Sequence, residues 1–208
     1  MVATQIVRRG IRDQRVLAAM RIVPRECFVD AAMAEFAYDD APLPIDAGQT
    51  VSQPYIVAAM IEAAELGPRD TVLEVGSGSG YAAAVLGRIA ARVYGIERHR
   101  MLVDAAERRL ASLGYRNIEW RVGDGSIGWP EAAPFDAILV AAGGPSVPSA
   151  LKEQLALGGR LVMPVGGDSW QRLLKLTRAS DAVYRQCDLG GVSFVPLVGA
   201  QGWPEPGR

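Results

Sequence analysis

A glycine-rich turn between a short apolar run and a helical pattern limits the folds open to this chain. The turn is Gly76-Ser77-Gly78-Ser79-Gly80, and the apolar run before it, residues 71–75, is typical of a buried strand. Further apolar runs and helical patterns alternate along the chain, with strands expected at 92–96, 118–122, 135–141 and 159–164, and helices at 79–90, 101–113 and 147–157. This alternation predicts an α/β fold, a doubly wound, Rossmann-like and mostly parallel sheet with helices on both faces.

An N-terminal addition is expected before that core. Apolar residues at helical spacing predict a short amphipathic helix at residues 12–20, ending before Pro24. A second helix is predicted to begin with Pro54 and run to about residue 66. Residues 38–54 between them are rich in Pro, Gly, Asp and Gln, so they are predicted to be irregular.

The end of the chain completes the predicted sheet. Residues 171–177 and 182–188 predict a hairpin that adds an antiparallel closing strand, and residues 192–198 a final apolar edge. We expect a single domain over residues 1–208, with N-terminal helices and a long loop in 1–66, the α/β core in 67–198 and a tail in 199–208.

Composition and charge narrow the classes of partner. Half of the 208 residues are hydrophobic and 22% are charged, the balance of a folded globular protein, and the formal net charge is -1. A nearly neutral chain has no overall field that attracts nucleic acid or an anionic membrane, so neither is expected as a partner. Cys27 and Cys187 belong to no Cys or His cluster, so no metal site is predicted. No leader or membrane-spanning run is visible, and we expect a cytoplasmic monomer.

The register of the glycine-rich turn disfavours a dinucleotide cofactor. In open α/β sheets, ligands bind beyond the carboxyl ends of the strands, where backbone N–H groups of the first strand-to-helix turn converge. Dinucleotide-binding turns carry Gly-x-Gly-x-x-Gly or Ala, and counting from Gly76 places Tyr81 at the last of these positions. Because a small residue is needed there for close packing of helix on strand, Tyr81 argues against an NAD-dependent dehydrogenase.

Three acidic residues close successive predicted strands. Glu74 lies beside the turn, where it would repel a pyrophosphate and suits a cation. Glu97 follows the second strand and can accept hydrogen bonds from both ribose hydroxyls, and Asp124-Gly125 follows the third and can read the amine of adenine. Each of the three alone is typical of an ordinary solvated carboxylate. Together, at the ends of successive strands, they predict S-adenosylmethionine, which carries a sulfonium and an ammonium group beside a nucleoside. The predicted cofactor-binding residues are Glu74, Gly76, Ser77, Gly78, Gly80, Glu97, Asp124 and Gly125.

Several motifs over roughly residues 16–197 carry a family resemblance. The most specific is Pro42-Leu43-Pro44-Ile45 followed by Gly48-Gln49-Thr50-Val51-Ser52-Gln53-Pro54-Tyr55, and residues 72–81 and Phe194-Val195-Pro196-Leu197 add to it. These motifs resemble the substrate-side loop, the cofactor loop and a late segment of the protein-L-isoaspartate O-methyltransferases. The resemblance implies methyl transfer from S-adenosylmethionine to the free α-carboxylate of an isoaspartyl residue in an age-damaged protein or peptide, which initiates repair.

By the same resemblance Ser52 is the active-site serine. A carboxylate acceptor has a pKa of about 4 and is already ionised at pH 7, so the transfer needs no base. The sole histidine, His99, lies on the ribose side and is more typical of the surface. We therefore expect Ser52 to orient the acceptor by donating a hydrogen bond. A second role stays open, as cap of the helix that begins at Pro54, and the two roles are compatible. The predicted substrate-binding residues are Gln49, Thr50, Ser52, Val195 and Pro196.

Two segments depart from the family pattern. A histidine is usual where Arg25-Glu26 stands, and a Thr-Ala-Ala pattern is usual where this chain reads Ala141-Ala142-Gly143-Gly144. The second segment lies near the expected acceptor position. Two alternatives therefore stay open, a carboxyl methyltransferase of the same scaffold that acts on another peptide carboxylate, and a cofactor-binding module without activity.

Overall fold

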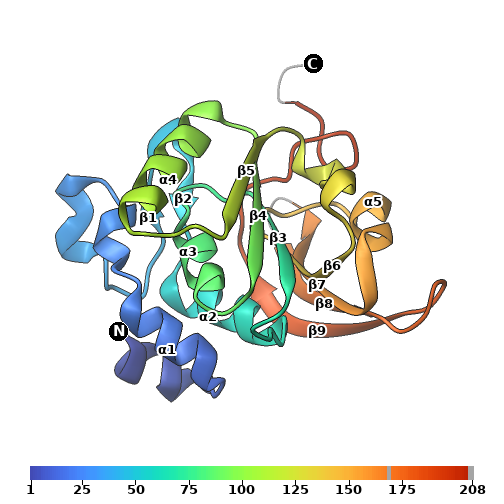
Figure 1. Cartoon of the computed structure of the whole chain (residues 1–208), viewed down its shortest axis with the longest axis horizontal. Coiled ribbons are helices and arrows are strands. Elements are labelled where there is room, and N and C mark those ends of the chain that lie inside the picture. Colours follow the sequence, from blue (N-terminus) through green and yellow to red (C-terminus); the bar gives the residue numbers. More distant parts are fainter. Residues whose placement is uncertain (168–169, 206–208) are drawn as a thin grey trace.

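The computed structural model describes residues 1–167 and 170–205, and its centre is a seven-stranded sheet (Figure 1). The strand order is β5-β4-β3-β6-β7-β8-β9, in which β3 to β7 are parallel to one another and β8 and β9 are each antiparallel to the preceding strand. The strands are β3 (Thr71–Val75), β4 (Arg92–Glu97), β5 (Ile118–Val122), β6 (Phe135–Val140), β7 (Leu155–Gly167), β8 (Trp170–Arg178) and β9 (Tyr184–Val192). The predicted doubly wound, mostly parallel sheet is confirmed.

Helices cover both faces of the sheet because alternate strand residues point to opposite sides. Val72 of β3 belongs to the core that includes α1 to α3, whereas Leu73 and Val75 belong to the opposite core with Leu151 of α5. Leu110 of α4 joins the first core. The helices are α1 (Gln14–Ile22), α2 (Pro54–Ala63), α3 (Tyr81–Gly87), α4 (Arg100–Ser112) and α5 (Ser149–Glu153). Short 3-10 turns at Gly125–Ile127 and Pro130–Ala132 follow β5.

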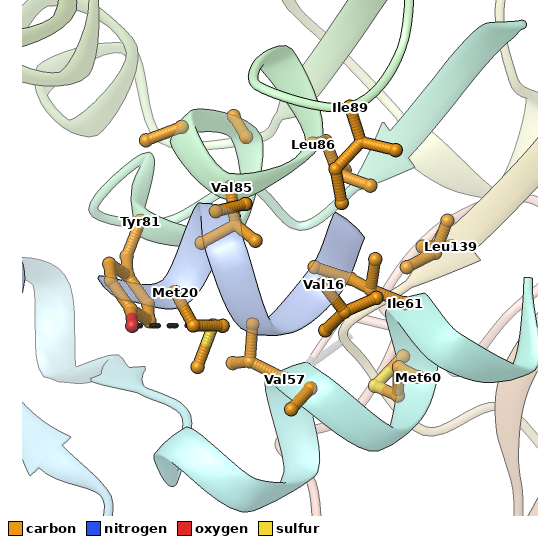
Figure 2. Close-up of a cluster of buried hydrophobic side chains, with 14 of the residues drawn as sticks. Val16, Met20, Val57, Met60, Ile61, Tyr81, Val85, Leu86, Ile89 and Leu139 are labelled. Carbon is orange, nitrogen blue, oxygen red and sulfur yellow. Dashed lines mark hydrogen bonds between the residues drawn. The ribbon is translucent and has the colours of Figure 1, made fainter. Parts of the chain in front are cut away.

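The N-terminal addition packs on α2 and α3. Helix α1 begins after Asp13, whose carboxylate accepts a hydrogen bond from the Arg15 backbone N–H at 2.8 Å, and it ends before Pro24 as predicted. Figure 2 shows Val16 and Met20 of α1 meeting side chains of α2 and α3. A π-helical turn (Val2–Ile6) and 3-10 helices at Val7–Arg9, Arg25–Phe28 and Ala31–Phe36 complete this part.

Residues 38–54, predicted to be irregular, contain a small hairpin. Strands β1 (Leu43–Pro44) and β2 (Thr50–Val51) pair antiparallel around a 3-10 turn at Asp46–Gly48. Ala47 and Gly48 have φ values of 58° and 66° in this turn. Two residues per strand are too few to show a period of two, which explains why the sequence pattern did not reveal the hairpin.

The closing strands are longer than predicted. Strand β7 begins at Leu155, inside the predicted helix 147–157, because Leu155 is fully buried and pairs with Phe135 of β6. The predicted apolar edge at 192–198 runs beside residue 143, with the Gly143 N–H donating to the Val195 carbonyl and the Leu197 N–H to the Gly143 carbonyl, both at 2.8 Å. Within the described residues, no helix is both long and apolar enough to cross a membrane.

Candidate functional site

A cavity of about 360 Å³ lies at the carboxyl ends of the central parallel strands. It brings together residues that are more than 140 positions apart, because the hairpin before α2 and the segment after β9 both return to this edge of the sheet. Most of the predicted site residues line it: Gln49, Thr50, Ser52, Glu74, Gly76, Ser77, Glu97, Gly125, Val195 and Pro196. Gly78, Gly80 and Asp124 do not.

The glycine-rich turn connects β3 to α3 beside this cavity. The Gly76 N–H donates to the Ile96 carbonyl at 2.8 Å, which ties the turn to β4. Gly80 has φ of 83°, and a Cβ atom there would lie 3.1 Å from the side chains of both Ala106 and Leu110. Gly80 therefore allows the turn to pack against α4, and its requirement for glycine is structural.

Tyr81 begins α3 and points into the core between α3 and the N-terminal addition. Its ring packs edge to face on Phe28 with a centroid separation of 5.5 Å. Figure 2 shows its hydroxyl directed at the sulfur of Met20, 3.6 Å away. The N-terminal addition thus buries the aromatic side chain that occupies the last position of the dinucleotide pattern. Tyr81 also lines the cavity, a contact that the sequence pattern did not predict.

Glu74 is a buried carboxyl group at the inner wall of the cavity. Its side chain is 2% exposed, and Oε2 has no hydrogen-bond partner among the described residues. Burial raises the pKa of Glu74 to about 8, a hydrogen bond from the Ser77 side chain opposes this rise, and the charge of Glu97 adds to it. A buried carboxyl group with one unpartnered oxygen beside a cavity is a place where a cation would be stabilised.

Glu97, at the end of β4, is held by backbone donors. Oε2 accepts a hydrogen bond from the Gly78 N–H at 3.1 Å, and Oε1 accepts one from the His99 N–H at 3.0 Å. The side chain is 6% exposed and lines the cavity. Gly78 therefore contributes to the site indirectly, by orienting a carboxylate that faces the cavity.

Asp124, after β5, is directed toward the tail of the chain. Its Oδ1 accepts hydrogen bonds from the Ser126 N–H at 2.8 Å and from the Ser126 hydroxyl at 2.6 Å, and its Oδ2 accepts one from the Ala200 N–H at 2.7 Å. Both carboxylate oxygens thus bind protein donors in this structure. The neighbouring Gly125 lines the cavity, and a Cβ atom there would overlap Val75.

Ser52 lies between β2 and α2 and lines the cavity. Helix α2 has Gln53 at its N-cap position, and among the described residues no side chain makes a capping hydrogen bond to it. The structure therefore does not use Ser52 as the cap of α2. The Ser52 backbone carbonyl accepts a hydrogen bond from Arg25 Nη1 at 2.9 Å, a contact that the sequence pattern did not predict.

The second segment that departs from the family pattern, residues 141–144, contributes to the wall of the cavity. Ala141 and Ala142 line the cavity, next to Val195 and Pro196. A Cβ atom on Gly143 would lie 2.5 Å from Nε2 of Gln171, so the glycine allows the close approach of β8. The Gln171 amide in turn donates to the Phe194 carbonyl at 3.0 Å and accepts from the Phe194 N–H at 2.8 Å.

Several lining residues were not among the predicted site residues. Ser79, Ile96 and Arg98 adjoin predicted positions, so their place in the sequence could have indicated them. Glu205 carries no such signal, because it reaches the cavity through an ion pair with Arg98, at 2.5 Å, over a sequence separation of 107 residues. Within the described residues, no group of three or more His, Cys, Asp or Glu side chains could hold a metal ion.

Comparison with known proteins gives a family match over nearly the whole chain. A profile described as protein-L-isoaspartate(D-aspartate) O-methyltransferase matches residues 1–202. A Pelobacter propionicus protein named protein-L-isoaspartate O-methyltransferase 2 is 60% identical over 98% of this chain and 91% of its own length. A Rhodopseudomonas palustris protein-L-isoaspartate O-methyltransferase is 58% identical over 99% of this chain and 95% of its own length.

Solved structures give the same relationship. A structure titled protein-L-isoaspartate O-methyltransferase superposes with a TM-score of 0.85 at 29% identity, covering 94% of this chain and 64% of that longer chain. A Plasmodium falciparum structure described as a protein-L-isoaspartate O-methyltransferase, in complex with S-adenosyl-L-homocysteine, has a TM-score of 0.80 at 28% identity and covers 92% of this chain and 94% of its own.

Proposed function

Because this chain belongs to the protein-L-isoaspartate(D-aspartate) O-methyltransferase family, we propose that it transfers a methyl group from S-adenosylmethionine to the free α-carboxylate of L-isoaspartyl residues in damaged proteins or peptides. This reaction would initiate repair of the damaged residue. The observation that carries the proposal is the single cavity into which both the Ser52 loop and the glycine-rich turn open, within a chain that matches the family over residues 1–202.

The residues on one side of the cavity fit S-adenosylmethionine. The buried carboxyl group of Glu74 has an oxygen without a partner, which suits the ammonium or sulfonium charge of such a ligand. Glu97, oriented by two backbone N–H groups, suits a ribose diol, and the close backbone at Gly125 suits a flat base. When bound, S-adenosylmethionine supplies a methyl group activated by its positive sulfur.

On the other side, Ser52 and the apolar walls suit a carboxylate acceptor. We infer that the Ser52 hydroxyl donates a hydrogen bond to one oxygen of the acceptor carboxylate. This bond would direct the other carboxylate oxygen toward the cofactor. Gln49 and Thr50 on the hairpin, together with Val195 and Pro196, line the cavity and would bind the flanking peptide and exclude water. No proton has to be removed from a carboxylate at pH 7, so positioning is the main contribution of these side chains.

Asp124 receives a structural role in this proposal. Because Asp124 does not line the cavity and its Oδ2 accepts the Ala200 N–H, we infer that it holds the tail at the base end of the cavity and that Gly125 makes the closer approach to the cofactor.

The test compares two peptides that differ in one linkage. Purified protein is given S-adenosylmethionine with a labelled methyl group and either an isoaspartyl peptide or the same peptide with normal aspartate. We expect a base-labile methyl ester on the isoaspartyl peptide alone. Equal labelling of both peptides would favour a carboxyl methyltransferase for another peptide carboxylate, and no labelling of either, with retained cofactor binding, would favour an inactive binding module.

A further inference from the structure

Arg25 is fully buried directly behind the Ser52 loop. Its side chain is 0% exposed, and it donates three hydrogen bonds to backbone carbonyls of residues 37–52. Nε donates to the Ala37 carbonyl at 2.6 Å, Nη1 to the Ser52 carbonyl at 2.9 Å, and Nη2 to the Ala41 carbonyl at 3.3 Å. One planar guanidinium group thus joins the end of the N-terminal addition, the start of the loop and the loop residue that faces the cavity.

The charge of Arg25 is stabilised without a close carboxylate. Within the part of the chain that the structure describes, no ion pair to Arg25 occurs, and Asp40, which favours its charged form, is paired with Arg9 at 2.8 Å. Burial lowers the pKa of Arg25, and the three carbonyl dipoles together with the Tyr81 ring, 5.0 Å from Cζ, offset the lost hydration. Burying a cation in this way is costly, and an apolar side chain of similar volume would avoid the cost.

The same side chain also contacts the cofactor side of the cavity. Tyr81, whose ring lies under the guanidinium group, follows Gly80 and lines the cavity together with Ser52. Arg25 therefore contacts the backbone of the loop that would hold the acceptor and the first residue of the helix behind the cofactor turn. The donors of a guanidinium group have fixed relative directions, so these contacts define the position of the Ser52 backbone more narrowly than a lysine would.

We propose that Arg25 is a positioning residue for methyl transfer, which fixes the Ser52 backbone and thereby the distance between the acceptor carboxylate and the cofactor. The inference rests on the proposed function, because it assigns Arg25 to the acceptor side of that reaction. A misplacement of about 1 Å at a reacting centre costs about 100-fold in rate, so loss of this support should lower turnover strongly.

The test uses Arg25→Lys and Arg25→Met, with Arg21→Lys and Arg21→Met as matched controls on the exposed surface of α1. Binding of S-adenosylhomocysteine is measured by calorimetry and gives the concentration of folded sites. Per folded site, we expect kcat for an isoaspartyl peptide to fall about 10- to 100-fold in the Arg25 variants, with cofactor affinity within about threefold of the parent protein. The Arg21 variants should match the parent protein in both measurements.

A second measurement separates positioning from general support of the fold. In a Ser52→Ala background, Arg25→Lys should lower kcat by less than about threefold, because the group that it positions is already absent. Full additivity of the two changes, or a loss of cofactor affinity as large as the loss of kcat, would overturn the proposal. Failure of the proposed function is distinguishable, because the parent protein itself would then transfer no methyl group to the isoaspartyl peptide.

Discussion

The backbone N–H of Gly78 donates to Oε2 of Glu97 across 3.1 Å, so the glycine-rich turn and the end of the neighbouring strand are joined at the wall of the cavity. A second backbone donor, the His99 N–H, holds the other oxygen at 3.0 Å. Two donors to one carboxylate give it a single orientation, in which it remains in contact with the cavity. Under the proposed function, this fixed orientation would let Glu97 accept a ribose diol without reorganising first.

Replacing Glu97 should weaken cofactor binding more than catalysis. In Glu97→Gln the amide keeps the shape of the side chain but cannot offer two anionic acceptors, so the turn and the ribose both lose charge-assisted hydrogen bonds. We expect the Kd for S-adenosylhomocysteine to rise about 10- to 100-fold in calorimetry, with a smaller effect on kcat at saturating cofactor. Glu107→Gln on the exposed side of α4 is the control, and an unchanged Kd in Glu97→Gln would contradict the assignment.

Glu74 should make cofactor binding depend on pH. Burial raises its pKa to about 8, so most molecules without ligand carry a neutral carboxyl group at pH 7, whereas a bound cation favours the carboxylate. Affinity for S-adenosylmethionine should therefore rise as pH increases from 6 to 8, with release of about one proton per molecule bound at pH 7. Calorimetry in buffers of different ionisation enthalpy measures the number of protons released on binding, and Glu74→Gln should abolish this release. Equal proton release by that variant would assign the effect to another group.

The same shift predicts how stability without cofactor depends on pH. The folded-state pKa of Glu74, about 8, lies above the ordinary glutamate pKa of 4.5, so folding favours the protonated form. The contribution of Glu74 to stability is therefore fully present below about pH 4.5 and is lost as pH rises through 8. Between pH 6 and 8.5 the melting temperature of the parent protein should fall more steeply than that of Glu74→Gln. If the melting temperatures of the two proteins depended on pH in the same way, the pKa of Glu74 would be the same in the folded and unfolded chains.

The strands and the three acidic residues could be predicted because their signals are local. Central parallel strands are buried on both faces and read as continuous apolar runs, and whatever follows each run must lie at one edge of the sheet. This reasoning predicted that Glu74 and Glu97 lie beside one cavity, as the structure has them. Asp124 was likewise predicted to lie at the same edge. The direction of its side chain could not be predicted, because it depends on a hydrogen bond from the Ala200 N–H, 76 positions away.

The features that sequence reasoning missed depend on contacts between distant segments. Arg25 belongs to a segment that departs from the family pattern, and nothing in its neighbourhood indicates that its guanidinium group would bind the Ser52 carbonyl 27 positions later. Trp203 donates from Nε1 to the Gly143 carbonyl at 3.0 Å, and Glu205 pairs with Arg98. Such contacts follow from the path of the tail over the sheet edge, which carries no periodic signal.

Ser52→Ala should depress turnover more than cofactor affinity. The hydroxyl is expected to contact only the acceptor, so its loss removes a hydrogen bond to a charged group, worth about 1.5–3 kcal/mol or about 10- to 100-fold in rate. Steady-state kinetics with an isoaspartyl peptide and calorimetry with S-adenosylhomocysteine give the two quantities. Ser112→Ala on the exposed end of α4 is the control. The reverse result, a weaker affinity for S-adenosylhomocysteine with a normal kcat, would assign Ser52 to cofactor binding.

Gly199→Ala should loosen the tail over the cavity. A Cβ atom on Gly199 would overlap Oδ1 of Asp124, the carboxylate that accepts the Ala200 N–H, so the tail has to shift. We expect a loss of about 1–3 kcal/mol in unfolding free energy and faster dissociation of S-adenosylhomocysteine, measured by denaturant unfolding and stopped-flow displacement. Gly191→Ala is the matched control, because a Cβ atom there has no atom within 4 Å. If Gly199→Ala lowered stability but left the dissociation rate unchanged, the tail would support the fold without covering the cofactor.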